Sequence, residues 1–359
     1  MDDVCRRVRT FCDGFGVTVP VLQAPMAGAC PPSLAAAVAG AGGMGACGAV
    51  LHGPEQIGEW MKAFRTGSPS GAVQLNVWVP DSPGSGSQER ERLAADAAAF
   101  LGEFGTAGES GGWSGPPPYR EQCEAMLTSQ PTVVSSIMGL FEPEYVRRLH
   151  AAGIAWFACA TTLEEALAAE EAGADAVVAQ GMEAGGHRGS FDPEDAERTD
   201  IGLFALVPWF ADHLRVPVVA AGGIGDGRGV AAALALGASA VQVGTALLRS
   251  PEAAIEAEWA DALDGLGPEA TLTTHAYTGR LSRAVTTPFL RAWQRPEAPR
   301  PAPFPDQAGL VGRWRAGGAP EVDPLNYFAG QSAALALPEP AGEIVTRMWQ
   351  DASALLGRR

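Results

Sequence analysis

The sequence predicts an α/β protein, a (β/α)8 TIM barrel with a mainly helical C-terminal cap. Short apolar runs without polar alternation recur along the chain, which is typical of parallel strands that are covered on both faces. Amphipathic helical stretches fall between these runs, and several end at a glycine suited to a left-handed C-cap, as at Gly153, Gly173 and Gly237. Eight such runs can be counted, and this number favours a closed barrel over an open doubly wound sheet.

The elements follow in order. The expected strands cover residues 19–24, 44–50, 73–79, 132–137, 154–160, 176–180, 216–221 and 240–243. The clearest expected helices cover residues 33–41, 55–65, 142–152, 163–172 and 229–236.

Two regions interrupt this alternation of strands and helices, and they define the expected domains. Residues 80–118 are rich in Gly, Pro and Ser around a helical patch at 88–104, which indicates an insertion after the third strand. Residues 1–266 would form the barrel. Residues 267–359, which include the proline-rich stretch 295–305, would form a cap segment packed on the barrel mouth.

Composition narrows the classes of function. A formal net charge of −16 argues against nucleic acid and anionic membrane as partners, because both require a basic face. Six cysteines show neither a C-x-x-C pair nor metal-ligand spacing, so we expect reduced, mostly buried thiols and no metal site. The start of the chain does not resemble a signal peptide, and no apolar stretch reaches about 18 residues. We therefore expect a soluble cytoplasmic protein, and the sequence leaves a homodimer open.

The strongest local signal is the segment AQGMEAGGHRG at residues 179–189, directly after the sixth strand. Its glycines allow positive φ angles and a close approach of backbone to a flat or anionic ligand. His187 lies in this loop at the catalytic end of the barrel, where an imidazole can act as a base, a proton relay or a hydrogen-bond donor. The alternative is that His187 only pins a glycine-rich turn, but its position favours function.

Two further glycine-bearing loops follow the seventh and eighth strands. They are AAGGIGDGRG at residues 220–229 and QVGT at residues 242–245. In such barrels these two loops commonly bind phosphate through backbone N–H groups and a helix N-terminus. Gly222, Gly223 and Gly244 remove side chains that would block the approach, and the hydroxyl of Thr245 adds a donor. The pattern predicts a phosphate-bearing cofactor, although tight helix–strand packing alone would also favour these glycines.

The segment GAGGMG at residues 40–45 matches the G-x-G-x-x-G dinucleotide pattern but has the wrong context. That pattern binds phosphate only after a strand and at the start of a helix. Here it follows a helix and precedes a strand, so we interpret it as a structural turn at the stable end of the barrel.

The first and third strands carry less specific candidates. QAPMAG at residues 23–28 ends the first strand, and Asn76 lies inside the third. A buried amide needs hydrogen-bond partners, which a ligand or the neighbouring backbone could equally supply. Met26 fits core packing and the lining of a flat ring equally well.

Taken together, these motifs resemble the nitronate monooxygenase family over nearly the whole chain. The resemblance also includes LNVWVP at residues 75–80, TGRLSRA at 278–284 and AGQSAAL at 329–335. It implies a non-covalently bound flavin mononucleotide (FMN) in the barrel mouth and makes His187 the active-site histidine. Where the family often carries a lysine or another polar group near the fourth strand, this chain has Ser135, Ser136 and Met138. The implied cofactor-binding positions are Pro25, Met26, Asn76, Gln180, Gly185, Gly186, Gly222, Gly223, Gln242, Gly244 and Thr245. Tyr327 and Gln331 would reach the substrate from the cap.

The activity implied by this resemblance is the oxidation of nitronates, and of nitroalkanes if His187 removes the α-proton, by O2. The products would be a carbonyl compound and nitrite. An FMN-dependent enoyl-thioester (enoyl-ACP) reductase that uses NAD(P)H shares the segment at residues 179–189, which we call the glycine–histidine loop. This loop therefore does not separate the reductase from the monooxygenase. The segments at 278–284 and 329–335 favour the monooxygenase. A non-catalytic flavin-binding pathway protein is the remaining alternative.

Overall fold

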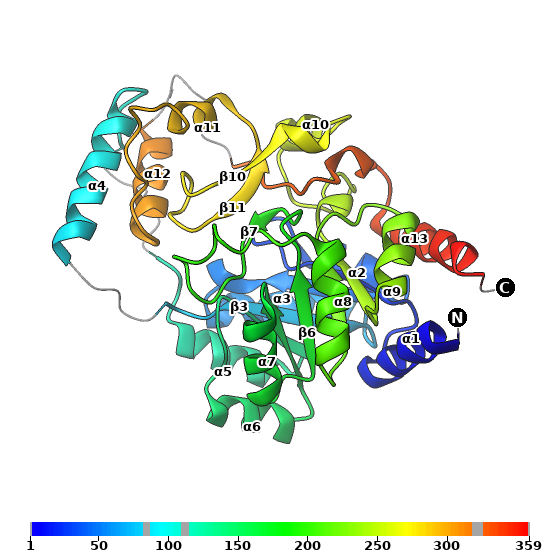
Figure 1. Cartoon of the computed structure of the whole chain (residues 1–359). Helices are drawn as coiled ribbons and strands as arrows, with labels where there is room; N and C mark the ends of the chain where they lie inside the picture. The colour runs from blue at the N-terminus through cyan, green and yellow to red at the C-terminus, as the bar shows by residue number, and fades with distance from the viewer. Residues whose placement is uncertain (1, 82–86, 109–114, 318–325, 358–359) are drawn as a thin grey trace.

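A computed structural model describes residues 2–81, 87–108, 115–317 and 326–357. Its centre is a closed barrel of eight parallel strands in the order β1-β2-β3-β4-β5-β6-β8-β9, with helices outside it (Figure 1). The ring closes where β1 pairs with β9, for example through Leu22 and Gln242. The predicted (β/α)8 barrel is therefore confirmed.

Each of the eight predicted strands overlaps an observed one. The bounds are β1 Val21–Gln23, β2 Met44–Gly48, β3 Ala72–Trp78, β4 Val133–Ile137, β5 Ala155–Ala160, β6 Ala176–Gln180, β8 Val218–Ala221 and β9 Ala240–Val243. The second strand ends earlier than expected, because the chain turns after Gly48 into the 3-10 helix η1 (Ala49–Leu51).

The five helices predicted most clearly are present with small shifts in their ends. The helices around the barrel, which include these five, are α1 Asp2–Phe15, α2 Pro32–Gly40, α3 Pro54–Gly67, α5 Tyr119–Ser129, α6 Pro143–Ala151, α7 Leu163–Glu171, α8 Leu203–His213 and α9 Gly227–Ala235. Thr162 begins α7 with a capping box, in which its hydroxyl accepts from the backbone N–H of Glu165 at 3.2 Å.

The segment that follows the barrel contains strands as well as helices. Strands β10 (Thr271–Thr274) and β11 (Ser282–Val285) form an antiparallel sheet, and the two-residue strand β7 (Gly186–His187) joins its edge from the glycine–histidine loop. The prediction of a mainly helical cap missed this sheet. The helices of this segment are α10 Ala257–Ala262, α11 Pro288–Trp293 and α12 Asp306–Ala316.

The insertion after β3 joins the cap. Its helix α4 (Ser87–Gly102) packs on α12 away from the barrel (Figure 1). Between the cap elements lies a small core of its own, with Tyr277, Phe289 and Trp314 almost completely buried. This core fixes the turn between β10 and β11 above the barrel.

The last helix, α13 (Ala341–Leu355), lies apart from the rest of the C-terminal segment. It packs on α9 and α2 at the outside of the barrel, and its buried side chains belong to the barrel core (Figure 1). Within the expected cap of residues 267–359, α13 therefore packs with the barrel and not with the other helices. Helix α13 fills the place of the helix that would follow the eighth barrel strand.

The glycines at 40–45 form the turn between α2 and β2, as the sequence analysis predicts. A Cβ on Gly43 would lie 2.3 Å from the carbonyl oxygen of Val21, and one on Gly45 would lie 2.5 Å from that of Ala35. Both positions therefore require glycine for packing. All six cysteines are free thiols, and five are buried.

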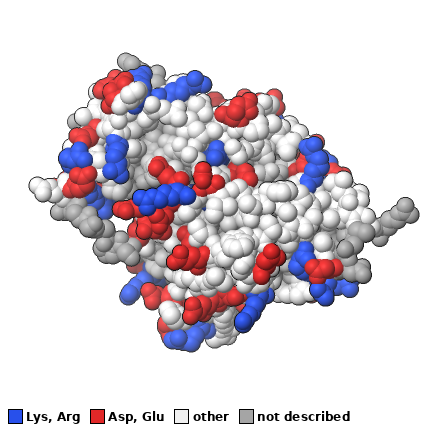
Figure 2. Space-filling view, viewed as in Figure 1, with Lys and Arg blue, Asp and Glu red and all other residues white. Residues whose placement is uncertain are grey.

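Acidic and basic side chains are interspersed on the face seen in Figure 2. Among the described residues, no helix is both long and apolar enough to cross a bilayer.

Candidate functional site

A cavity of about 440 Å³ opens at the carboxyl ends of the barrel strands, between the barrel and the cap. Its volume falls in the usual range of small-molecule sites. All twelve residues predicted to bind the cofactor or to act in catalysis line it. They are Pro25, Met26, Asn76, Gln180, Gly185, Gly186, His187, Gly222, Gly223, Gln242, Gly244 and Thr245.

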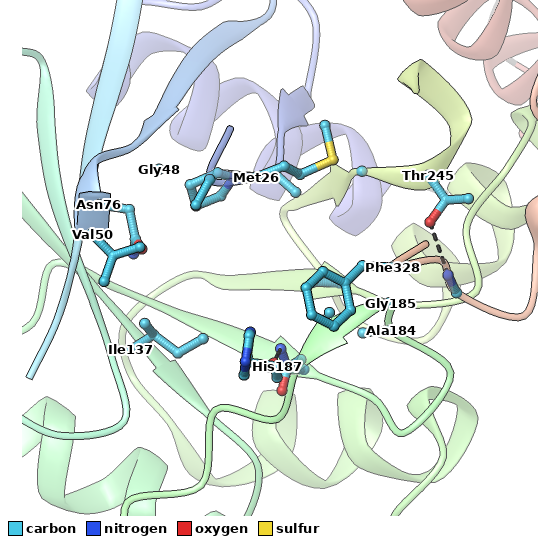
Figure 3. Close-up of a pocket in the computed structure, with 18 of the residues that line it drawn as sticks. Met26, Gly48, Val50, Asn76, Ile137, Ala184, Gly185, His187, Thr245 and Phe328 are labelled. Carbon is cyan, nitrogen blue, oxygen red and sulfur yellow. Dashed lines mark hydrogen bonds between the residues drawn. The ribbon is translucent and has the colours of Figure 1, made fainter. Parts of the chain in front are cut away.

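The residues labelled in Figure 3 lie around the cavity in this view. His187 and Phe328 lie opposite Met26, while Asn76 and Thr245 lie on the two remaining sides. Glycines keep this space open. A Cβ on Gly48 would lie 2.6 Å from the backbone nitrogen of Ala27, and one on Gly244 would lie 3.2 Å from the sulfur of Met26. A side chain at position 48 would displace the backbone of the loop after β1, and one at position 244 would press on the side chain of Met26.

Backbone donors gather at the loops after β8 and β9. Within the described part of the chain, the N–H groups of Gly223, Gly244 and Thr245 make no hydrogen bond. Gly223 reaches its position through a φ of +66°, which disfavours any side chain. The hydroxyl of Thr245 accepts from the N–H of Gly330 at 2.9 Å and keeps its own hydrogen as a donor. These donors could hold an anion.

The helix N-terminus expected at this site is already capped. Asp226 begins α9, and its carboxylate accepts from the backbone N–H groups of Arg228 at 2.9 Å and Gly229 at 3.3 Å. The carboxylate therefore occupies the place that a phosphate would take. The free donors are those of Gly223 and of Gly244 and Thr245, which lie at the start of the 3-10 helix η2 (Thr245–Leu247), and not those of α9.

Two amide side chains extend the polar lining. Asn76 donates to the hydroxyl of Ser135 at 3.0 Å, which leaves its oxygen as an acceptor. Gln242 accepts from Gln74 at 3.0 Å, which leaves its own NH2 group as a donor. Both residues lie at the strand ends that form the cavity floor. A ligand with both donors and acceptors along one edge would match them.

His187 is held at the edge of the cap sheet. In the antiparallel pairing of β7 with β11, His187 lies opposite Ser282. The imidazole Nε2 of His187 lies 2.9 Å from the hydroxyl oxygen of Thr278. The rings of Trp78 and Phe328 lie 4.5 Å and 5.2 Å from the imidazole. Burial among these groups lowers the pKa of His187 to about 3, so the free site holds a neutral imidazole.

Gln180 serves the loop that carries His187. Its Nε2 donates to the carbonyl of His187 at 3.0 Å, and its Oε1 accepts from the N–H of Gly189 at 2.7 Å. Both ends of the amide are therefore engaged within the protein, although the side chain lines the cavity. Gln180 therefore fixes the loop, and its second N–H and second lone pair remain for the cofactor contact expected from the sequence.

Tyr327 and Gln331 do not line the cavity, contrary to their expected role with substrate. Tyr327 is buried in a separate apolar cluster with Ala29 and Leu248. Gln331 is held through its main chain, whose N–H donates to the carbonyl of Glu183 at 3.0 Å. Their neighbours in the same segment line the cavity instead, namely Asn326, Phe328, Gly330 and Ser332.

Several lining residues were missed by the sequence analysis. Trp78 could have been found, because it lies two positions after Asn76 in the same strand and so faces the same side. Tyr277, Thr278, Phe304 and Arg315 come from the cap. Thr278 begins the segment TGRLSRA at 278–284, which carries part of the resemblance, whereas no local pattern places the other three near the barrel.

Comparison with known proteins shows the family of the chain. The family model described as "Nitronate monooxygenase" matches residues 9–351. This chain belongs to the nitronate monooxygenase family. A relative named nitronate monooxygenase from Paraburkholderia phytofirmans is 37% identical over 350 residues, which cover 93% of this chain and 92% of that protein. The family is one of flavin-dependent oxidoreductases.

Solved structures resemble the whole chain of this family member. The nitroalkane oxidase from Streptomyces ansochromogenes superposes with a TM-score of 0.85 at 35% identity, covering 97% of this chain and 99% of that chain. FabK from Thermotoga maritima superposes with a TM-score of 0.73 at 28% identity, covering 97% of each chain.

Proposed function

We propose that this protein binds FMN in the cavity and oxidises nitronates, and nitroalkanes, with molecular oxygen to a carbonyl compound and nitrite. The observation that carries the proposal is a neutral imidazole facing a glycine-lined cavity at the carboxyl ends of the strands. The likeness to nitronate monooxygenases and to a nitroalkane oxidase supports the same reaction class.

The residues of the cavity fit FMN. The phosphate would be held by the free N–H groups of Gly223, Gly244 and Thr245, which replace solvent without adding a charged side chain. The ring system carries donors and acceptors on one edge, and Asn76 and Gln242 offer the complementary groups. Met26 would lie against the ring.

When bound, FMN would supply the redox chemistry that the side chains lack. The protein contributes orientation and a dry environment. His187 would donate a hydrogen bond to the nitronate oxygens, and with a neutral nitroalkane it would take the α-proton as a base. The imidazolium formed in that step would lie beside the new nitronate anion, which offsets the cost of charging a buried ring.

Aromatic side chains of the cap, together with Trp78 at the end of β3, would exclude water from the reacting groups. Trp78 and Phe328 contact the imidazole ring, and Phe304 packs on Trp78 with ring centroids 5.5 Å apart. Tyr277 lies behind Phe328. Exclusion of water strengthens a hydrogen bond from His187 to an anionic substrate.

The test is oxygen uptake and nitrite release by the FMN-loaded protein with propionate-3-nitronate and alkyl nitronates. We expect nitronate-dependent uptake without added NADH or NADPH. Reduction of an enoyl thioester by NAD(P)H, with no nitronate-dependent uptake, would overturn the proposal in favour of the reductase. A flavin-loaded protein that is inert with both substrate classes would leave only a binding function.

Replacing His187 tests the role of the imidazole. His187→Asn should lower kcat/KM for nitroalkanes by about 10²–10⁴-fold, because general-base catalysis contributes that range. Bound FMN should remain near the parental level, since none of the phosphate-site donors is changed. Parental kinetics in this variant, with both substrate types, would exclude a catalytic role for His187.

A further inference from the structure

The two roles proposed for His187 need opposite states of the same nitrogen. A hydrogen bond to a nitronate requires an N–H group toward the cavity, whereas removal of an α-proton requires a lone pair there. Nε2 is engaged with Thr278, and Nδ1 has no hydrogen-bond partner among the described residues. Nδ1 is therefore the atom left for the substrate, and the state of Nε2 decides what Nδ1 presents.

The hydroxyl of Thr278 can satisfy Nε2 in either state. Its oxygen lies 3.3 Å from the backbone nitrogen of Arg280, which donates to it, and 3.4 Å from the carbonyl oxygen of the same residue. When the hydroxyl donates to Nε2, the ring carries its proton on Nδ1. When Nε2 carries the proton and donates to the hydroxyl, the hydroxyl hydrogen can turn to the Arg280 carbonyl.

We propose that Thr278 is a positioning residue that lets His187 present either a donor or an acceptor at Nδ1. With a nitronate, Nδ1–H donates while the threonine hydroxyl donates to Nε2. With a nitroalkane, the Nδ1 lone pair takes the α-proton, and the resulting imidazolium donates through Nε2 to the hydroxyl oxygen. The proposal rests on the function assigned to His187 above.

The turn that carries Thr278 is held firmly enough for this role. The side chain of Arg280 is only 3% exposed, forms an ion pair with Asp81, and donates to the carbonyl of Ser190 at 3.3 Å. Gly279 has a φ of +88°, and a Cβ there would lie 2.3 Å from the carbonyl of Ala302. These contacts join the turn to the loop after β3 and to the loop that carries His187.

The hydroxyl of Thr278 is an uncharged partner for His187, and this suits the electrostatics of the site. In many catalytic sites a carboxylate orients the histidine, stabilises its cation and raises its pKa. Among the described residues that line this cavity there is no Asp or Glu, and the ring neighbours are Trp78, Phe328 and Thr278. A hydroxyl orients the imidazole without favouring its charged form. Both neutral tautomers therefore remain accessible.

The experiment compares Thr278→Val, Thr278→Ser and His187→Asn in the FMN-loaded enzyme with a nitroalkane and with its preformed nitronate. Thr278→Val keeps the shape of the side chain but leaves Nε2 without a partner. We expect kcat/KM for the nitroalkane to fall about 10–100-fold and kcat/KM for the nitronate to fall less. Only the nitroalkane reaction forms an imidazolium at His187, and hydrogen bonds to charged groups are the stronger ones. Thr278→Ser should restore both to within about threefold of the parent.

A direct readout without turnover is the ¹⁵N NMR spectrum of the His187 ring. We expect the parent and Thr278→Ser to give a mixture of neutral tautomers, and Thr278→Val to shift toward one of them. If Thr278→Val folds poorly, Thr278→Ala and the parental spectrum provide the same comparison. Equal losses with both substrates and an unchanged tautomer ratio would overturn the proposal, as would parental kinetics in Thr278→Val. If His187→Asn itself retains parental kinetics, the proposed function fails first.

Discussion

Two hydrogen bonds hold His187 itself, and a third holds the loop just after it. Gln180 holds its carbonyl and the N–H of Gly189, and Thr278 holds the imidazole. Gly186, with a φ of +73°, allows the sharp turn just before it. The loop is rich in glycine, yet the histidine within it has a defined orientation. This rigidity is what a residue that contacts reacting atoms requires.

The depressed pKa of His187 predicts the pH profile. Burial lowers its pKa from the ordinary 6.5 to about 3, so the ring stays neutral from pH 8 down to pH 5. We expect kcat/KM for freshly prepared nitronate to show no inflection near pH 6.5 that depends on His187. An inflection there that disappears in His187→Asn would contradict this environment. The same shift affects folding, because the unfolded ring takes up a proton below pH 6.5 while the folded one does not. The stability that the neutral ring contributes is present above pH 6.5 and is lost as the pH falls toward 3.

At this scale the sequence predicts some residues well and others poorly. Glycines that follow strands, and a histidine among them, mark the cavity because barrel geometry brings all strand ends together. Thr278 and Phe328 cannot be found this way, because they reach the cavity only through packing of the cap. Tyr327 was expected to face substrate, but alternation along an extended segment directs its neighbours there instead.

At the scale of elements, the contact between the glycine–histidine loop and residues 329–331 joins barrel and cap. A Cβ on Gly185 would lie 2.4 Å from the nitrogen of Gly330, and one on Gly330 would lie 2.7 Å from the carbonyl of Glu183. The side chain of Arg283 in β11 adds a hydrogen bond to the carbonyl of Met182 at 2.9 Å. The two segments approach so closely that both must be glycine where they meet.

Gly185→Ala should separate these segments. We expect it to destabilise the protein by about 1–3 kcal/mol through overpacking and to weaken FMN binding, because the loop lines the cavity proposed to hold FMN. Gly58→Ala is the matched control, since Gly58 is exposed within α3 and a Cβ there meets nothing within 4 Å. That control should stabilise by about 0.5–1 kcal/mol. Thermal unfolding and a flavin titration measure both effects, and parental FMN affinity in Gly185→Ala would contradict the account.

The regular elements of the barrel were predictable because burial on both faces leaves a continuous apolar run. Helix α8 was missed because its sequence is apolar on most sides and contains Pro208. The sheet of β7, β10 and β11 was missed because it joins segments about 90 residues apart, and β7 has only two residues. Local periodicity carries no information about such pairing.

At the scale of the whole molecule, α13 closes the outer ring of helices after the chain has crossed the barrel mouth. Ile344, Val345 and Met348 pack into the barrel core. A Cβ on Gly227 would lie 2.4 Å from the Cβ of Asp351, so α9 and α13 are in close contact. The cap is therefore joined to the barrel at both ends, through the strands and helices that precede it in the sequence and through α13, which follows it.

Met348→Ala should destabilise the protein without a direct effect on the reaction. The side chain is 2% exposed, and truncation of such a residue costs about 2–5 kcal/mol. Gln350→Ala, on the exposed face of the same helix, should change stability by less than about 0.5 kcal/mol. Chemical denaturation measures both. A loss of kcat in folded Met348→Ala as large as that in His187→Asn would contradict a purely structural role for α13.

The most direct test of the central claim is the visible absorbance of the FMN-loaded protein when a nitronate is added without oxygen. The account predicts that the flavin band bleaches on addition of the nitronate and returns when oxygen is admitted. A protein that does not take up FMN, or one whose flavin band is unchanged by every nitronate, would contradict the claim that this cavity brings flavin and nitronate together.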